Sequence, residues 1–515
     1  MVPEFPVHGS TLFQHLKYIS HSQPDRIALS DSDRSWSYQE LCAEAEVLAT
    51  GLVAAAGTNR GAVAVISENR PEVCLCWLAG SRSGLVTSIL NPHLTPAELA
   101  KPLARLKPRL VVTPDHHLDK VSEALDIAGL DVPMVTLGEG SDTARRVIFY
   151  EGTMDGDPYK GPHPAGDDIF EVGWTSGTTS DPKGVALSHF GVVSHWAAVQ
   201  QAIGLRSSDV AYVVTPLYHQ SGLRHTTLVT WLAGGRAHLA SRFSPSLYWD
   251  DVRNIGATYT CLVPTMTHIL RTATPDELLA YPMRRPGYCY GSTETGVPIS
   301  VPHSTPTADI DSYLNYRAGA VFAGWATPGC EVKITGEADA APQKGTEGEI
   351  LIKSPGMLRR YWNDPEASEA SFVDGWFKSG DKGLRGRNGS IYFVDRLRDL
   401  VRRGGENIAC REIEEVLLSH PSIEQVAVFS VPDPLWGEEA KAVVIPIKGA
   451  TIDPNNIWDW CQQRLTDFKV PRYLEFRNTL PVSTSGKVQK AVLRQEGLLP
   501  DRSADRKHRL PGSSA

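Results

Sequence analysis

Features that define several common protein classes are absent from these 515 residues. No stretch approaches about 18 uninterrupted apolar residues, so no membrane-spanning helix is predicted. Residues 1–10 lack a basic segment leading into an apolar one, so no secretory signal peptide is expected. The last three residues are not the Ser-Lys-Leu peroxisomal address. These absences favour a cytoplasmic location.

An excess of positive charge and closely paired cysteines are also missing. The formal net charge is −8, which argues against a nucleic-acid polymer as partner. Of eight scattered cysteines, only Cys74 and Cys76 lie close together, and their spacing fits neither a zinc knuckle nor a redox C-x-x-C motif. Their apolar setting predicts buried, reduced thiols, as in an intracellular protein.

The chain is too long for one small core, so two or more domains are expected. Apolar runs and helical patterns alternate through the first half, which predicts an α/β fold with a parallel sheet and crossover helices. The expected strands include 62–66, 84–89, 110–113, 210–215 and 259–263, and the expected helices include 69–82, 96–105, 190–203, 223–232 and 248–254. Ser37 and Glu40 have the spacing of a capping box that opens another helix.

From residue 321 onward the pattern changes to shorter antiparallel strands, expected at 329–334, 348–352 and 390–394, with Lys378 to Gly383 between two of them. A helix over 410–418 and strands near 425–431 and 441–447 then indicate a compact α+β module. The sequence thus predicts a large N-terminal α/β domain with parallel sheets and a small β subdomain (1–397). A smaller, mobile α+β C-terminal domain (398–500) and a disordered tail (501–515) follow.

The segment Trp174 to Gly184 carries five hydroxyl side chains, two glycines and Lys183 directly after a predicted buried strand. A glycine-containing turn lets backbone N–H groups converge on an anion. Hydroxyls and a lysine add donors suited to phosphate. The order of residues is not that of a P-loop. Taken alone, the segment is equally well interpreted as a polyphosphate clamp or as a polar surface loop.

Further motifs follow in a definite order: Tyr290-Gly291-Ser292-Thr293-Glu294, Ser379-Gly380-Asp381, Asp395-Arg396, Gly404-Gly405-Glu406-Asn407-Ile408 and Ser485-Gly486-Lys487. Together with 175–184, they make the chain resemble the adenylate-forming (AMP-binding) family, in its acyl-CoA synthetase branch, over nearly its whole length. Agreement of six motifs in order is far more specific than any one of them.

The resemblance implies a reaction in two halves. A carboxylate attacks the α-phosphorus of ATP to give an acyl-adenylate and pyrophosphate, and the thiol of coenzyme A then displaces AMP. ATP, Mg²⁺ and coenzyme A are therefore the implied cofactors and co-substrates, and a small carboxylic acid is the implied substrate.

The same resemblance assigns roles around ATP. The phosphate loop would bind the β- and γ-phosphates through Thr175, Ser176, Gly177, Thr178, Thr179 and Lys183. Tyr290 and Gly291 would contact adenine, Thr293 would donate to the α-phosphate, and Glu294 would bind Mg²⁺, which prefers carboxylate oxygen. Asp381 would accept the ribose hydroxyls, and Arg396 would contact ribose or phosphate.

Lys487 would reach the oxygen between acyl group and phosphate while adenylate forms. The family's C-terminal domain moves between the two half-reactions, and Arg398 stands at the expected hinge, where relatives usually have aspartate or lysine. Gly404 and Gly405 would line the approach of coenzyme A. His219 matches a family position beside the acyl pocket, although a hydrogen-bonded histidine at a strand end is the plainer interpretation. Arg224 could pair with a second substrate carboxylate.

One stretch departs from the family pattern. Between the segment at 263–265 and Tyr290, the chain is short by roughly one βα unit of ~30–40 residues, and the Gly-Ala-Pro turn that closes over adenine is missing. Two other functions therefore stay open beside the acyl-CoA ligase: a stand-alone adenylation protein that loads a carrier protein, and an inactive nucleotide-binding pseudoenzyme.

Overall fold

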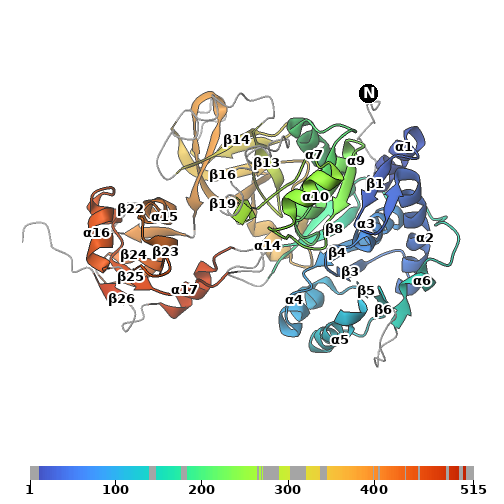
Figure 1. Ribbon diagram of the computed structural model, residues 1–515, viewed down its shortest axis with the longest axis horizontal. Coiled ribbons are helices and arrows are strands. Elements are labelled where there is room, and N and C mark those ends of the chain that lie inside the picture. Colours follow the sequence, from blue (N-terminus) through green and yellow to red (C-terminus); the bar gives the residue numbers. More distant parts are fainter. Residues whose placement is uncertain are drawn as a thin grey trace, which may run out of the picture.

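The computed structural model describes residues 11–138, 147–175, 182–263, 266–267, 269–270, 289–301, 320–336, 345–397, 399–403, 406–434, 436–450, 453–482, 487–497 and 503–505. Two sheets built largely from parallel strands form the N-terminal half, an antiparallel sheet follows, and the last unit lies at one end of the molecule (Figure 1).

The main sheet has the strand order β17-β9-β8-β4-β3-β5-β6-β7, and the pairs from β8 to β7 are parallel. Its strands are β3 (Ala62–Ile66), β4 (Val86–Leu90), β5 (Leu110–Thr113), β6 (Met134–Thr136), β7 (Val147–Phe149), β8 (Ile169–Trp174), β9 (Gly184–Ser188) and β17 (Arg360–Tyr361). All five residues of β3 are buried, because helices cover both faces of the sheet and a continuous apolar run is then required.

The second sheet has the order β10-β11-β1-β2, formed by β1 (Ile27–Ser30), β2 (Ser35–Ser37), β10 (Val210–Val213) and β11 (Arg236–Leu239). Helices α1 (Leu12–Ser22), α2 (Tyr38–Ala56), α3 (Pro71–Ser83), α7 (His189–Ile203) and α9 (Val229–Leu232) share one core with both sheets. The outer face of the main sheet packs on α4 (Pro96–Leu106) and α5 (Leu118–Ile127), and that of the second sheet on α10 (Tyr248–Ile255). This layering confirms the predicted α/β class.

Helix α2 begins and ends at capping residues that can be recognised in the sequence. Ser37 caps α2 through its side chain, and Glu40 returns a hydrogen bond to the backbone of Ser37, which completes the expected capping box. Gly57 ends the same helix in the left-handed region at φ 68°, a conformation that glycine adopts without strain.

The antiparallel sheet runs β12-β13-β14-β20-β19-β16-β15, with β18 beside β19. Its strands are β12 (Cys289–Ser292), β13 (Gly296–Ser300), β14 (Val321–Ala326), β15 (Glu331–Ile334), β16 (Glu347–Lys353), β18 (Phe372–Val373), β19 (Trp376–Arg385) and β20 (Ile391–Arg396); the helix α14 (Pro365–Ala370) and the short helix α6 (Tyr150–Thr153) lie outside the sheets. Lys378 to Gly383, which the sequence places between two expected strands, lie within a further strand, β19. The register of β19 with β16 and β20 shifts around them.

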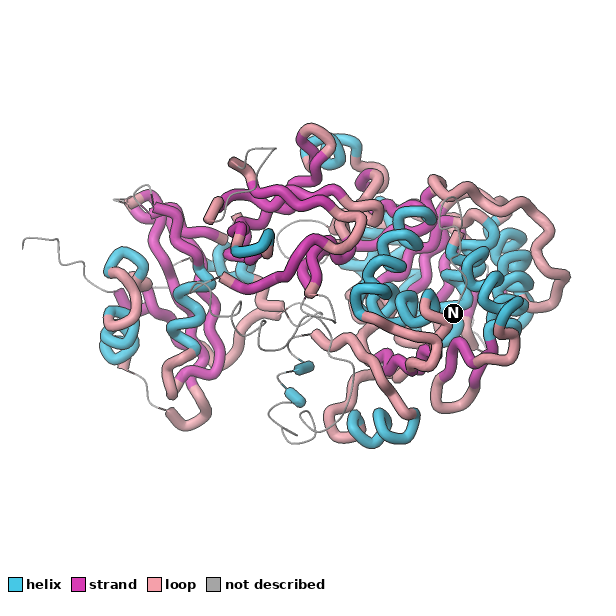
Figure 2. The backbone as a smooth tube through the Cα atoms, turned by 90° about the horizontal axis from the view of Figure 1, so that it is seen from above, coloured by secondary structure: helices cyan, strands magenta, loops and turns pink. Residues whose placement is uncertain are grey.

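The C-terminal unit is the predicted α+β module and lies at the left of Figure 2. It contains β21 (Leu400–Arg403), β22 (Glu406–Ala409), α15 (Cys410–Leu418), β23 (Ile423–Asp433), β24 (Gly437–Pro446), α16 (Pro454–Gln462), β25 (Tyr473–Phe476), α17 (Lys490–Glu496) and β26 (Ser503–Asp505). One face of its sheet packs on α15 and α16, and the other on α17.

Part of the tail expected to be disordered is a strand. Residues 503–505 pair with β25 in antiparallel register, and Asp505 forms an ion pair with Arg472 at 3.0 Å. The backbone hydrogen bonds of a free sheet edge explain this pairing, which a polar composition does not reveal. The rest of the tail lies outside the described residues.

Two expected elements near the second sheet differ from the prediction. Over 259–263, only Tyr259 joins β10, through a single bridge to Ala211, because the hydroxyl of Thr260 takes the carbonyl of Tyr212. The helix expected over 223–232 is a short helix α8 (Gln220–Gly222), a π-helical turn (Leu223–Leu228) and then α9. The hydroxyls of Thr226 and Thr227 bond the carbonyls five residues earlier, which favours the wider turn.

No helix in the described ranges is long and apolar enough to cross a membrane. Residues 271–288 lie outside the described residues, as do 264, 265 and 268. They make up most of the stretch that the sequence marks as shortened.

Candidate active site

The base of the phosphate loop is closed by its two ends. The backbone N–H of Thr175 donates to the carbonyl of Lys183 at 3.1 Å, and the N–H of Lys183 donates to the hydroxyl of Thr175 at 3.0 Å. The loop therefore begins and ends between β8 and β9, at the carboxyl edge of the main sheet. Four of its predicted phosphate ligands, Ser176, Gly177, Thr178 and Thr179, lie outside the described residues.

Lys183 and Glu294 both contact the side chain of Tyr361. The ammonium of Lys183 lies 4.8 Å from the centre of the Tyr361 ring, and the phenol of Tyr361 donates to Glu294 Oε1 at 3.1 Å. Tyr361 reaches this place because β17 pairs with β9 directly after the loop. Tyr361 was not predicted from the sequence, because no motif surrounds it and only the strand pairing brings it near Lys183.

Tyr290 and Asp381 are joined directly. The Tyr290 phenol donates to Asp381 Oδ2 at 2.6 Å, and Arg396 Nε lies 3.7 Å from Asp381 Oδ1. Burial, and next the carboxylate of Asp381, raise the pKa of Tyr290 well above its usual value, so the phenol keeps its proton. At Gly291 an added Cβ would lie 1.8 Å from the carbonyl oxygen of Gly296, so only glycine fits where the register of β12 against β13 shifts.

His195 supports the start of β13 and was likewise not predicted from the sequence. Its Nε2 accepts a 2.8 Å hydrogen bond from the backbone N–H of Val297, and its Nδ1 lies 3.2 Å from the hydroxyl of Ser354. Burial lowers the pKa of His195 to about 3, which keeps the ring neutral and able to accept. A histidine in a helix gives no sequence signal for this role.

Lys487 lies close enough to three site residues for their charges to interact. Its pKa is lowered by loss of solvent first and by Arg396 next, while Asp381 acts in the opposite direction. Its positive charge also helps to lower the pKa of His219 to about 4, after the larger effect of burial. Lys487 of the C-terminal unit is therefore within range of the charges of candidate site residues from earlier parts of the chain. An ion pair of 2.6 Å between Arg494 and Asp399 joins α17 to the segment before β21.

His219 stands at the end of the segment that follows β10. Its Nε2 is buried and has no hydrogen-bond partner among the described residues, and the same is true of Gln220 Oε1. Unpaired buried polar atoms cost free energy unless a ligand or water satisfies them. This position is thus suited to a polar ligand group.

A buried ion pair lies beside Thr293. Arg224 Nε is 3.7 Å from Glu171 Oε1, and both side chains are at most 5% exposed. A Cβ placed on Gly173 would meet Thr293 Cγ2 at 3.0 Å and the guanidinium of Arg224 at 3.5 Å, so Arg224 and Thr293 face the same small space. The Thr293 hydroxyl also lies 3.5 Å from the carbonyl of Trp174, beside the phosphate loop.

The described candidate site residues therefore come from five parts of the chain: Thr175 and Lys183; His219; Tyr290, Gly291, Thr293 and Glu294; Asp381 and Arg396; and Lys487. The predicted hinge Arg398 and the predicted coenzyme A contacts Gly404 and Gly405 lie outside the described residues.

Comparison with known proteins decides the family. The model of the AMP-binding enzyme family matches residues 17–285 and 283–362, and that of the AMP-binding enzyme C-terminal domain matches 412–487. The chain belongs to the AMP-binding enzyme family. The first match is broken at 283–285, within the stretch that the sequence marks as shortened.

Curated relatives of this AMP-binding enzyme are CoA ligases. Oxalate–CoA ligase of Arabidopsis thaliana is 30% identical over 511 residues, which cover 95% of this chain and 99% of the relative. With the family match, this assigns the chain to the AMP-forming acyl-CoA synthetases. The two other functions considered from the sequence, carrier-protein loading and an inactive pseudoenzyme, gain no support.

Solved structures agree with this assignment. ATP-bound MatB from Rhodopseudomonas palustris is 28% identical, with a TM-score of 0.83 over 95% of this chain and 99% of MatB. The apo form of MatB, with the same identity and coverage, scores 0.70. O-succinylbenzoate coenzyme A synthetase (MenE) from Bacillus subtilis in complex with ATP and magnesium is 26% identical, with a TM-score of 0.77 over 94% of this chain and 98% of MenE. The arrangement described above thus resembles the ATP-bound form of MatB more than its apo form.

Proposed function

We propose that this AMP-binding enzyme couples a carboxylic acid to coenzyme A in two steps at one site. In the first, the carboxylate oxygen bonds to the α-phosphorus of ATP and pyrophosphate leaves. In the second, the thiol of coenzyme A attacks the acyl carbon, the thiol proton is lost to solvent, and AMP leaves. ATP binding and the ligase class are supported by the family and by the relatives above.

The phosphate end of the site would be formed by the loop from Thr175 to Lys183. Lys183 supplies a positive charge for the β- and γ-phosphates, and Thr293 a hydroxyl for the α-phosphate. Glu294 fits a magnesium ion: it is half-buried and offers carboxylate oxygens beside the phosphate loop. Bound Mg²⁺ would neutralise phosphate charge there.

The nucleoside end would be formed by Tyr290 and Asp381. Tyr290 offers an aromatic surface to adenine, and its phenol orients the Asp381 carboxylate for the ribose hydroxyls. Arg396, next to Asp381, supplies positive charge at the junction with the C-terminal unit.

The single observation that carries the proposal is the position of Lys487. A lysine from the C-terminal unit interacts with the charges of Asp381 and Arg396 and with His219. The acid would lie on the His219 side and ATP on the Asp381 side, so Lys487 would stand where negative charge develops as the acyl-phosphate bond forms. A donor at such a place typically contributes ~10²–10³ in rate.

The second step would need a different position of the C-terminal unit. The expected hinge at Arg398 and the expected coenzyme A contacts at Gly404 and Gly405 remain proposals from the family resemblance.

A pyrophosphate-release screen across fatty, aryl and dicarboxylic acids tests the function and finds the substrate class. The expected result is acid-dependent release of pyrophosphate and AMP, with a thioester formed only when coenzyme A is added. Release of pyrophosphate without any thioester on addition of coenzyme A would contradict the second step. No acid-dependent release with any class would contradict the whole proposal.

A further inference from the structure

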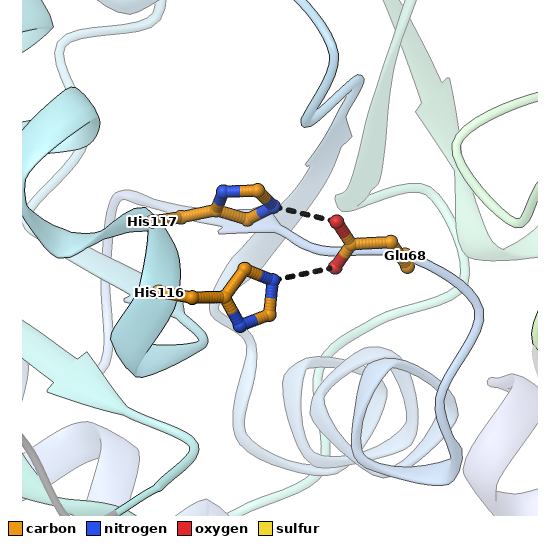
Figure 3. Close-up of side chains that lie close together, drawn as sticks. All are labelled: Glu68, His116 and His117. Carbon is orange, nitrogen blue, oxygen red and sulfur yellow. Dashed lines mark hydrogen bonds and ion pairs between the residues drawn. The ribbon is translucent and has the colours of Figure 1, made fainter.

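Two histidines and a glutamate meet at the carboxyl edge of the main sheet, outside the residues assigned to ATP or the acid. Glu68 lies just after β3, and His116 and His117 belong to a 3₁₀ turn (Asp115–His117) just after β5. Because β3 and β5 are paired in parallel, their carboxyl ends lie next to each other. We refer to these three residues as the Glu68 cluster (Figure 3).

Both imidazole rings point their Nε2 atoms at the same carboxylate. His117 Nε2 is 2.6 Å from Glu68 Oε1, and His116 Nε2 is 3.5 Å from Glu68 Oε2, as Figure 3 shows. The ligand atoms of all three residues lie within 4.8 Å of one another. Adjacent ligands of a tetrahedral zinc ion are about 3.3–3.5 Å apart, given zinc–ligand distances of about 2.0–2.2 Å. The distance from His116 Nε2 to Glu68 Oε2 already has this value. The distance from His117 Nε2 to Glu68 Oε1 would have to lengthen by about 0.8 Å.

The outer face of the cluster has the partner that a metal-bound histidine usually has. Nδ1 of His116 is 3.5 Å from Oδ1 of Asp115, so a second carboxylate stands behind the ring. In metal sites such a carboxylate orients the imidazole and increases its basicity. The His117 side chain is 13% exposed and that of His116 56%, so one ligand is held in the fold and the other leaves the site open to solvent.

We propose that the Glu68 cluster binds one zinc ion, or a similar transition-metal ion, through His116, His117 and Glu68. Two imidazole nitrogens and a carboxylate suit Zn²⁺, whereas Mg²⁺ prefers oxygen ligands, so this site is distinct in chemistry from the magnesium proposed at Glu294. Three protein ligands leave a fourth position for water. Binding would break the hydrogen bond between His117 and Glu68 and release any proton carried on either ligating Nε2.

The ion would link the turn after β3 to the turn after β5. The strand order β8-β4-β3-β5 places these turns on the same edge as the phosphate loop, which begins after β8. Zinc would therefore stabilise the fold beside the nucleotide site without entering it. The proposal does not depend on the proposed ligase activity, since zinc binding is measured without ATP or acid.

Titration of the untagged full-length protein with ZnCl₂, read by calorimetry and by competition with a chromogenic chelator, tests the site. We expect one zinc ion per chain in the wild type. Affinity should fall by more than ~100-fold in His116→Gln and in Glu68→Gln, and by roughly tenfold in Asp115→Asn, which changes only the outer carboxylate. His93→Gln is the matched control, because His93 is an exposed histidine in the turn after β4 at the same edge, and it should bind zinc as the wild type does.

His116 is more than half exposed, so its replacement should leave the metal-free melting temperature unchanged. Added zinc should raise the melting temperature of the wild type and of His93→Gln but not that of His116→Gln. Equal zinc affinity in the wild type, His116→Gln and Glu68→Gln would overturn the proposal, as would a wild type that binds no zinc.

Discussion

The phenol of Tyr290 donates a 2.6 Å hydrogen bond to the carboxylate of Asp381, 91 residues further along the chain. This bond ties β12 to the middle of β19, and so joins two motifs that the sequence shows only as separate signals. Adenine and ribose are bound together in ATP, and one hydrogen bond would position the groups that contact both.

Tyr290→Phe should lower kcat/KM for ATP by roughly tenfold, because a hydrogen bond to a charged group contributes about 1.5 kcal/mol. The ring remains, so the effect should be smaller than that of Tyr290→Ala, which also removes the aromatic surface. Steady-state pyrophosphate release at varied ATP measures both. An unchanged kcat/KM in Tyr290→Phe would show that this bond does not orient Asp381 for ATP.

Glu294→Gln should raise the magnesium concentration needed for half-maximal activity by ~10²-fold, because an amide oxygen is a poorer ligand than a carboxylate. Tyr361→Phe removes only the 3.1 Å hydrogen bond to Glu294 and should raise it by roughly tenfold. Titration of the initial rate with magnesium measures the half-maximal concentration in both variants and so ranks the two effects. A larger effect in Tyr361→Phe than in Glu294→Gln would contradict the assignment.

The buried pair of Arg224 and Glu171 allows stability and activity to be separated. Arg224→Met should destabilise the protein by about 3 kcal/mol, because it leaves a buried carboxyl without its partner. The double variant Arg224→Met/Glu171→Met should regain most of that stability. If Arg224 acts on the substrate beside Thr293, the double variant stays slow, with a raised KM for the acid. Recovery of activity together with stability would make the pair purely structural.

Five buried histidines predict loss of stability in acid. Burial lowers the pKa of His15, His219 and His225 to about 4 and that of His189 and His195 to about 3. In the unfolded chain these histidines take up protons near their usual pKa of 6.5, whereas in the folded chain they stay neutral to lower pH. Their contribution to stability is therefore complete above about pH 6.5 and is lost as the pH falls toward about 4.

Urea unfolding at pH values about half a unit apart, between about 7.5 and about 4.5, measures this loss. His219→Gln should reduce the slope of stability against pH by about one proton in the lower part of that range. The same slope in wild type and His219→Gln would show that His219 is not held neutral by the fold.

Much of the fold could be predicted from sequence, because continuous apolar runs such as 62–66 and capping pairs such as Ser37 and Glu40 act locally. The motifs around Lys183, Glu294 and Asp381 likewise indicated the candidate site. Tyr361, His195 and the strand at 503–505 could not be predicted, because their roles come from pairing or packing with distant segments. The Glu68 cluster was missed for the same reason: its two segments meet only through the parallel pairing of β3 and β5.

Lys487 is proposed to serve the first half-reaction at a site shared with His219 and Asp381. Rapid-quench measurement of both half-reactions in Lys487→Ala tests it most directly, with Lys448→Ala, an exposed lysine of the same unit, as the control. We predict that Lys487→Ala forms adenylate ~10²–10³-fold more slowly yet converts supplied acyl-adenylate and coenzyme A to thioester at the rate of the control. Equal loss of both half-reactions, or of neither, would contradict the account.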